Sequence, residues 1–318
     1  MRKVLAIVLA ALVAGGCNAP RPTEQSRSIG FATALTRSLV SSAEELQQLQ
    51  IKLFGTYTLS ERTVRIFDEQ TLYYNDELPG WDYASTQYWI SGAYYNFFAV
   101  APFETSCYLS EGKNQVILSE YSSWTDGPDV LYASAKRDLA VVEDFSAVPL
   151  TFHHACAAVQ FNIVNASNNV LTDVRNVRLV GLCNKGTFRF SPDGVAEWAL
   201  DGSTVAATAA EQPFAGSCIL PNGGLPVNLT VEHPLYENSV VVVLPQSIYK
   251  SGVTLHMEYK KVGDSEYAVR DIGLGLLGGT TPTEWKAGEL YKYNLNITDN
   301  TITTEVKVVD WVDNFVDL

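Results

Sequence analysis

The sequence predicts an all-β protein built from antiparallel β-sandwiches. Apolar residues recur at every second position through most of the chain, which is the spacing of a half-buried strand. Turn-forming residues separate these runs, for example at residues 79–80, 126–128 and 221–224. A helical pattern is confined to residues 41–50, "SSAEELQQLQ". Many short strands separated by turns are typical of sandwich folds.

The alternating segments follow this helix in order along the chain. They are residues 49–57, 63–70, 159–165, 176–182, 186–191, 253–261, 290–298 and 301–311. Residues 238–245, "NSVVVVLP", form a continuous apolar run instead, which is typical of a strand covered on both faces. The charged segment 136–143 interrupts the alternation, and a new strand series starts at Leu150. We therefore predict an N-terminal domain of residues 38–145 and a C-terminal domain of residues 146–318.

The densest aromatic segment is "WDYASTQYWISGAYYNFFAVAP", residues 81–102. Tyr88, Phe98 and Val100 stand at even-numbered positions with other apolar residues and would share one face of a strand. Trp89 and Phe97 stand at odd-numbered positions on the opposite face, which is equally apolar. A strand with two apolar faces needs cover on both, so we predict a central strand in a domain core. The alternative is an exposed platform on which sugar rings stack.

The first residues resemble a secretory leader. Arg2 and Lys3 precede an uncharged run of 13 residues, which is shorter than the roughly 20 residues that span a bilayer. Small residues then lead into Cys17, as at a bacterial lipoprotein cleavage site. We predict a signal peptide at residues 1–16 and lipid on Cys17, which anchors the protein without crossing the membrane. The alternative is an ordinary signal peptide cut after Ala14 or Gly16.

The net charge is −13 with a pI near 4.7, which disfavours nucleic acid and anionic membranes as partners. Beyond Cys17, the cysteines are Cys107, Cys156, Cys183 and Cys218, with no C-x-x-C pair. Strand parity puts Cys156 on the outward face and Cys183 on the apolar face, so we predict no bridge between them.

Catalytic and metal-binding motifs are missing from the sequence. His153, His154 and Cys156 are close in sequence, but no further ligands follow at zinc spacing. The glycine-rich segment 273–279 precedes a predicted strand rather than the helix that a phosphate loop requires. The sequence therefore predicts a protein that is not an enzyme and binds no cofactor or metal.

Five motifs in order resemble the fimbrillin-like lipoproteins, the subunits of type V pili of Gram-negative gut and oral bacteria. The first is the aromatic segment 81–102, which resembles their W-x-Y…Y-W…Y-x-F-F-A-x-A-P stretch. The others are "LTFHHACAAVQFNI" (150–163), "VVVLPQS" (241–247), "EWKAGELYKYNLNI" (284–297) and "VKVVDWVD" (306–313). Together they span nearly the whole chain.

The resemblance implies two tandem transthyretin-like β-sandwich domains and a pilus subunit with a structural or adhesive role. It implies an exported, lipid-anchored precursor, processed by a lipoprotein signal peptidase and an arginine-specific protease. Other pilus subunits and a host surface receptor are the implied partners. The implied location is the outer membrane and the cell-surface fimbrium. The alternative function is a stand-alone surface lipoprotein that binds glycan or a host protein.

The resemblance also assigns roles near the N-terminus. Residues 17–37 would be a lipidated pro-segment, with residues 28–35, "SIGFATAL", as a placeholder strand. Cleavage after Arg37 would leave Ser38 as the new N-terminus, with Arg27 and Arg62 as lesser candidate sites. Loss of the strand would leave a groove that a strand from another subunit fills.

The C-terminal segment 304–318 is rich in β-forming residues and lacks proline and glycine. We expect it to supply the donor strand, with Val306 and Val308 on one face and Trp311 and Phe315 on the other. Few residues follow Trp311, which would also suit a terminal subunit that receives a strand and gives none.

Overall fold

A computed structural model describes most of the chain between Arg27 and Trp311. The described residues are 27–35, 43–77, 79–122, 129–165, 171–201, 210–213, 240–249, 252–261, 263–276, 282–297 and 302–311. Within these ranges strands dominate, and α1 (Ala43–Gln48) is the one α-helix. The all-β class and the helix at residues 41–50 are therefore confirmed. No helix in the described part of the chain is long and apolar enough to cross a membrane.

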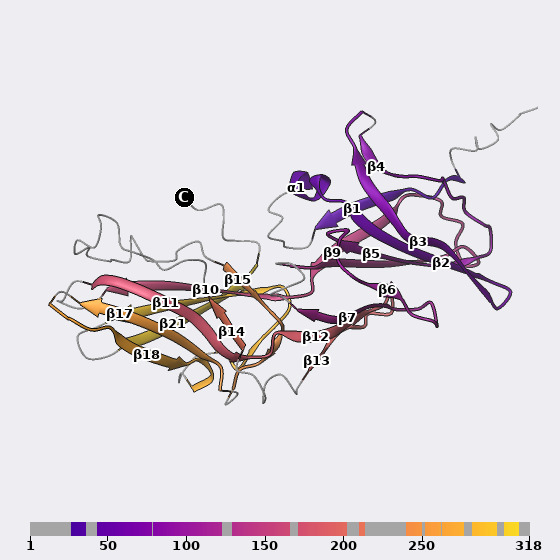
Figure 1. Ribbon diagram of the computed structural model, residues 1–318. Coiled ribbons are helices and arrows are strands. Elements are labelled where there is room, and N and C mark those ends of the chain that lie inside the picture. The colour runs from indigo at the N-terminus through magenta and orange to yellow at the C-terminus, as the bar shows by residue number, and fades with distance from the viewer. Residues whose placement is uncertain are drawn as a thin grey trace, which may run out of the picture.

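The N-terminal part forms a closed barrel of seven strands (Figure 1). Around the ring these are β1 (Phe31–Leu35), β4 (Gly80–Tyr83), β3 (Arg62–Asn75), β2 (Ile51–Leu59), β5 (Tyr94–Ala101), β8 (Leu131–Asp138) and β9 (Val148–His154). Neighbours are antiparallel except β1 and β9, which are parallel. A parallel pair needs a long crossover connection, and here the rest of the barrel supplies it. The prediction of purely antiparallel sheets is wrong at this pair and at one pair in the other half of the molecule, β10 (Ala157–Asn165) with β20 (Glu289–Ile297), which is also parallel.

Strand β5 lies between β2 and β8 and is covered on both faces. Tyr95 and Phe97 point into the barrel, whereas Phe98 and Val100 belong to a second core outside it, and all four are 0% exposed. The central strand predicted from the aromatic segment is confirmed for Tyr94–Ala101, but the expected burial of Tyr88 is wrong, because Tyr88 lies outside β5 and is 54% exposed. The alternative of a sugar-stacking platform is wrong for the four buried residues of β5, because burial leaves no ring face for a ligand.

A second sheet packs against the outside of the barrel. Its strands are β13 (Ala196–Leu200), β12 (Lys185–Phe190), β7 (Val116–Ser122) and β6 (Tyr108–Leu109). Strand β12 pairs with β7, although β12 follows β9 by about thirty residues of chain. The predicted domain boundary at residues 145/146 stays a prediction. Strands β9 and β12 both follow this boundary in the sequence, yet they pair with β8 and β7, which precede it.

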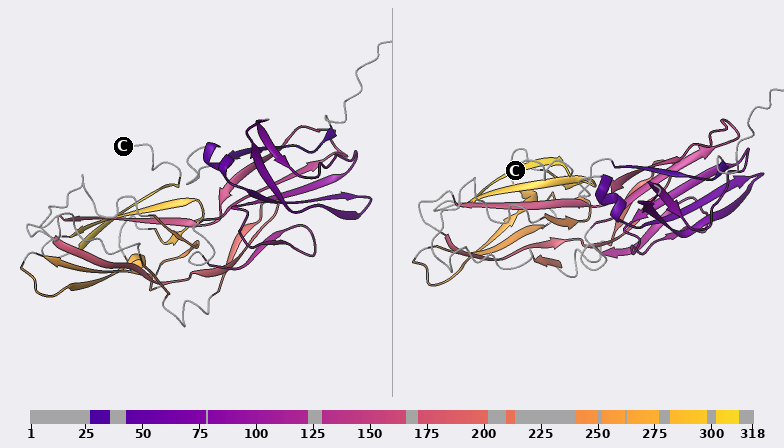
Figure 2. Two further views of the ribbon diagram at one scale, coloured as in Figure 1. Left: turned by 45° about the horizontal axis from the view of Figure 1, so that its top comes forward. Right: turned by 90° about the horizontal axis from the view of Figure 1, so that it is seen from above.

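Two further sheets face each other at the other end of an elongated molecule (Figure 2). One contains β15 (Val240–Val243), β10 (Ala157–Asn165), β20 (Glu289–Ile297) and β21 (Ile302–Asp310). The other contains β14 (Ala210–Pro213), β11 (Leu171–Leu182), β17 (Thr254–Lys261) and β18 (Ala268–Gly273). The short 3₁₀ helix η2 (Leu274–Leu276) follows β18, and β16 (Gln246–Ser247) pairs with β19 (Glu284–Trp285).

The strands predicted from alternation are all present in these sheets. Strand β15 and the residue after it confirm the interpretation of the apolar run at 238–245. Val241 and Val243 face the core between the two sheets, while Val242 and Leu244 face the core that joins this end to the barrel. Burial on both faces explains why the run does not alternate.

The described cysteines are free thiols. Cys156 and Cys183 form no bridge, as predicted, although both are 0% exposed, so the expected outward-facing Cys156 is wrong. The second face of its segment is covered too, because Cys156 lies in the core that joins the two ends. Burial raises the pKa of Cys107 to about 12, so this thiol stays protonated at neutral pH. Cys218 lies outside the described residues.

Candidate functional site

Strand β1 is held in the barrel mainly by strand β9. Five successive residues pair in parallel, from Phe31 opposite Val148 to Leu35 opposite Phe152. The N–H of Val148 also donates a hydrogen bond of 2.8 Å to the carbonyl of Gly30, just before the strand. Because β1 is the first strand of the described chain, it closes the ring from the N-terminal side (Figure 1).

The other edge of β1 is attached more sparsely. Phe31 opposite Trp81 is the one residue pair that joins β1 to β4. Upstream of the strand, the N–H of Ile29 donates a hydrogen bond of 2.9 Å to the carbonyl of Gln87. Strand β1 therefore lies between two neighbouring strands with a continuous ladder on one side only.

Two apolar side chains anchor β1 in the barrel core. Ile29 is 2% exposed and Phe31 is 6% exposed. The ring of Phe31 contacts Phe67, Tyr83 and Phe97 edge to face, with centroids 5.8, 5.8 and 5.6 Å apart. Burying each anchor stabilises the barrel by about 1.5–3 kcal/mol. We call the surface that receives β1 the β1 groove. It consists of the edges of β4 and β9 together with the side chains of Phe67, Tyr83 and Phe97.

A glycine on β2 shapes the floor of the β1 groove. A Cβ at Gly55 would lie 2.6 Å from the ring of Phe67, closer than side chains approach one another. The absence of a side chain at this position leaves room for the ring of Phe67, which contacts the ring of Phe31. The alternating pattern of β2 is thus interrupted by a residue that serves the groove.

The hydroxyl of Tyr83 ties the groove to the backbone of the β1 segment. It donates a hydrogen bond of 2.7 Å to the carbonyl of Ile29 and accepts one of 3.3 Å from the N–H of Gln87. Burial raises the pKa of Tyr83, so the hydroxyl remains a donor. A buried carbonyl that loses its donor is costly, which makes this contact measurable.

We expect Tyr83→Phe to lower the free energy of unfolding by about 1–3 kcal/mol, because the carbonyl of Ile29 would remain buried without its partner. Urea denaturation measures the change. Tyr73→Phe is the matched control: Tyr73 is 39% exposed on the adjacent strand, and its variant should stay within about 0.5 kcal/mol of the wild type. Equal stability of both variants would contradict the role given to Tyr83.

The connection after β1 contains the predicted cleavage site. Arg37 and Ser38, like Cys17, lie outside the described residues. The described chain resumes at α1, where Leu46 is 1% exposed in the same core as Phe31. A cut between β1 and α1 would therefore separate β1 covalently from the barrel and leave α1 attached to it.

The predicted donor residues lie in the sheet and core of their own chain. β21 pairs along its whole length with β20; Val306 packs on the core between the sheets, and Val308 is 43% exposed. Trp311 is 0% exposed and stacks on His154 with centroids 4.2 Å apart. Phe315 lies outside the described residues. Donation by this segment stays a prediction, and it would require Val306 and Trp311 to leave these positions.

The histidines of the predicted strand start have structural contacts. Nδ1 of His154 lies 2.6 Å from Oδ2 of Asp129, while His153 packs on the ring of Tyr132. In the described part of the chain no cluster of His, Cys, Asp or Glu side chains has the arrangement of a metal site. Of the glycine-rich segment, Gly273 ends β18 and is followed by the three-residue η2.

The sequence resemblance predicts a strand at residues 28–35, but it does not identify the residues that receive its side chains. Phe67, Tyr83 and Phe97 come from three different strands, and no local pattern shows that they meet. The aromatic residues at alternating positions on β3, β4 and β5 were the available signal. This alternation indicates which face of each strand is buried, but it does not show that β1 packs against these three faces.

Comparisons with known proteins agree with this architecture. A family model described as fimbrillin-like matches residues 36–311. A solved fimbrial protein from Bacteroides vulgatus has a TM-score of 0.58 at 16% identity, covering 90% of this chain and 99% of its own. A candidate cell adhesion protein from Bacteroides uniformis has a TM-score of 0.55 at 15% identity, covering 92% of this chain and 100% of its own.

A third structure, a candidate cell adhesion protein from Bacteroides ovatus, has a TM-score of 0.51 at 13% identity and covers 90% of this chain and 98% of its own. The search of curated proteins found no match. At these identities the structures show a shared fold. The family model spans far more than half of the sequence, from just after β1 to Trp311. The chain therefore belongs to the fimbrillin-like family.

Proposed function

We propose that this protein is a structural or adhesive pilus subunit that assembles by exchange of strand β1. The precursor is exported as a lipoprotein anchored through Cys17 in the outer membrane. An arginine-specific protease cuts after Arg37, β1 leaves with the anchor, and a strand from another subunit enters the β1 groove. The observation that carries the proposal is the position of β1: an N-terminal strand whose anchors Ile29 and Phe31 fill the barrel core.

Once β1 is removed, a groove filled by another strand is more stable than an empty one. Removing β1 exposes the rings that Phe31 covers and leaves the facing backbone groups of β4 and β9 without strand partners. Unpaired strand edges recruit other strands, because the donor satisfies the ladder and buries apolar side chains at once. Before the cut, β1 occupies this edge and prevents premature assembly.

The extent of the family match supports the same division. The match begins at residue 36, so it omits β1 although β1 is part of the barrel. A segment that is structurally integral yet outside the shared family region is what a removable pro-segment would be. Arg37 is the second residue of the matched region and lies two residues after the end of β1.

We expect a labelled fatty acid to be incorporated into the wild-type precursor and not into Cys17→Ala, because the acyl chains attach to that thiol. Measurement is by labelling of growing cells and recovery of the protein. Cys107→Ala is the matched control and should be labelled like the wild type, since Cys107 is a buried free thiol. Equal labelling of all three proteins would refute the anchor.

The donor strand in this proposal comes from the C-terminal end of a neighbouring subunit. Trp311 is held in the core and stacked on His154, so donation that includes Trp311 must break these contacts, whereas donation limited to the remainder of the segment, residues 312–318, would keep them. Phe315 belongs to this remainder. A subunit lacking this remainder would accept a strand without giving one.

The experiment that tests assembly is limited digestion of the precursor with an arginine-specific protease, followed by sizing and identification of the new N-terminal residue. Concatemers that begin with Ser38 support the proposal. A trimmed protein that stays monomeric contradicts it and leaves the stand-alone surface lipoprotein as the remaining function.

A further inference from the structure

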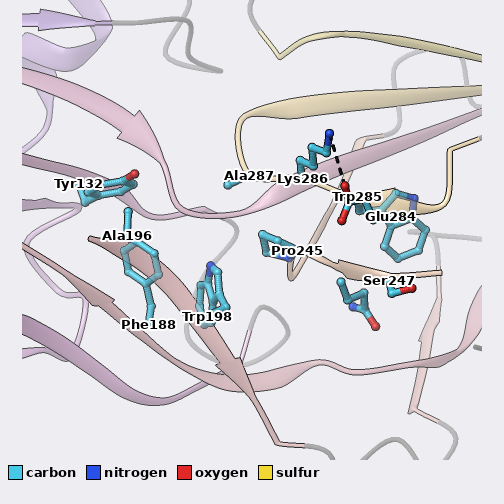
Figure 3. Close-up of a pocket in the computed structure, with 11 residues that line it drawn as sticks. Tyr132, Phe188, Ala196, Trp198, Pro245, Ser247, Glu284, Trp285, Lys286 and Ala287 are labelled. Carbon is cyan, nitrogen blue, oxygen red and sulfur yellow. Dashed lines mark ion pairs between the residues drawn. The ribbon is translucent and has the colours of Figure 1, made fainter. Parts of the chain in front are cut away.

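A groove lies where the barrel-side sheet meets the sheets of the second half. Its volume is about 340 Å³ (Figure 3). Tyr132, Phe188 and Trp198 form one wall, and Ser247, Glu284 and Lys286 belong to the other. We call this the junction groove. No part of the strand-exchange mechanism uses it.

A second depression of about 440 Å³ continues the junction groove. The two share Tyr132 and Ala287, and the second also contains His153, Glu289 and Asp310. Both volumes fall within the range of about 300–1,000 Å³ that is typical of small-molecule sites, which often lie between structural units. The two hollows therefore adjoin at Tyr132 and Ala287, and we call the second one the extension of the junction groove.

Aromatic rings form a continuous row along one wall. The centroids of His153 and Tyr132 are 5.7 Å apart, those of Tyr132 and Phe188 5.0 Å, and those of Phe188 and Trp198 5.1 Å. Nε1 of Trp198 donates a hydrogen bond of 2.6 Å to the carbonyl of Ala155, which fixes its ring. Tyr132 and Trp198 are only partly buried, so ring surface remains accessible.

The facing wall and the extension are polar. Glu284 and Lys286 form an ion pair of 3.4 Å, with side chains 54% and 60% exposed. The hydroxyl of Tyr291 donates a hydrogen bond to Glu289. Burial lowers the pKa of His153, as does neighbouring His154, so its ring is neutral at neutral pH and both donates and accepts hydrogen bonds.

This combination selects a class of ligand. An anion would meet Glu284, Glu289 and Asp310 against the single lysine, in a protein of net charge −13. A wholly apolar ligand would strip water from these carboxylates without replacing their hydrogen bonds. A cation would find Glu284 already paired with Lys286 and Glu289 already accepting a hydrogen bond from Tyr291.

We propose that the junction groove binds a neutral oligosaccharide. The C–H faces of the sugar rings pack on Tyr132 and Trp198, and the hydroxyl groups hydrogen-bond to Ser247, Glu284 and the acidic residues of the extension. A sugar has both surfaces in alternation, which matches a row of rings opposite a row of donors and acceptors. The junction groove itself contains no residue of β1, β4, β9 or the donor segment 304–318, so strand exchange does not use its lining.

The test is isothermal titration of the full-length chain with three neutral tetrasaccharides: cellotetraose, maltotetraose and N-acetylchitotetraose. Sialyllactose and tetralysine are the anionic and cationic comparison probes. We expect at least one neutral tetrasaccharide to bind and to change the tryptophan fluorescence, since Trp198 lines the groove. Tyr132→Ala should weaken this binding about tenfold or more, the effect of losing one ring contact.

Glu284→Gln should weaken the same binding several-fold, and this exposed residue can be changed without disturbing the core. Tyr108→Ala is the matched control: Tyr108 is 48% exposed on β6, outside the groove, and its variant should bind like the wild type. The proposal is overturned if no tetrasaccharide binds at millimolar concentration, if only tetralysine or sialyllactose binds, or if all variants bind equally.

Discussion

Arg37→Ala will leave the protein monomeric after treatment with an arginine-specific protease, whereas the wild-type precursor will polymerise. The uncut link keeps β1 at a high effective concentration beside its groove, in the millimolar range or above for a short connection. A free donor strand at micromolar concentration then loses the competition. The measurement is the size distribution after digestion, by chromatography and gel electrophoresis.

The energy of the β1 contacts sets the size of this effect. Ile29 and Phe31 together bury side chains worth about 3–6 kcal/mol, which is a factor of roughly 10² to 10⁴ in occupancy of the groove. The five residue pairs with β9 add to this. After cleavage, a β1 segment that dissociates is diluted into solution and does not return to the groove. Hydrolysis of one peptide bond therefore controls assembly.

Arg62→Ala is the matched control, because Arg62 begins β3 at an exposed turn and is a lesser candidate cleavage site. This variant should be cut and should polymerise at the wild-type rate. If Arg37→Ala polymerises equally fast, the trigger lies elsewhere and the role of Arg37 is wrong. If Arg62→Ala is the variant that fails, the cleavage site has been misassigned.

Phe98→Ala will lower the free energy of unfolding by about 3–5 kcal/mol, the usual cost of truncating a buried phenylalanine. Phe98 is 0% exposed, and its ring lies 6.1 Å from that of Phe190 on β12. The side chain fills the core between the barrel and the second sheet, where surrounding strands restrict collapse into the cavity. Urea or thermal denaturation measures the loss.

Tyr88→Ala is the matched control from the same aromatic segment. Tyr88 is 54% exposed, so its variant should differ from the wild type by no more than about 0.5 kcal/mol. A large loss for Phe98→Ala with none for Tyr88→Ala distinguishes core from surface within one segment. Similar small changes in both would mean that this segment is exposed in solution.

The sequence by itself determined the strands whose apolar residues alternate or cover both faces, but it did not locate β7, β8, β13, β14 or β18. Alternation located the strands of both ends, and two apolar parities identified β5 as covered on both sides. The resemblance to the fimbrillin-like lipoproteins placed a strand at residues 28–35, and Ile29 and Phe31 of this segment are buried in the barrel core. The alternation of apolar residues predicts which side chains are buried, because successive side chains of a strand point to opposite faces of the sheet.

The tertiary structure alone decided which strands become neighbours. No local signal shows that β1 lies parallel to β9, that β12 crosses to β7, or that Trp311 stacks on His154. The same is true of the junction groove, whose lining brings together Tyr132 and Glu284, about 150 residues apart in the sequence. Backbone hydrogen bonds are alike for every strand, so partners are chosen by closure of the barrel and by packing of whole sheets, which no single segment contains.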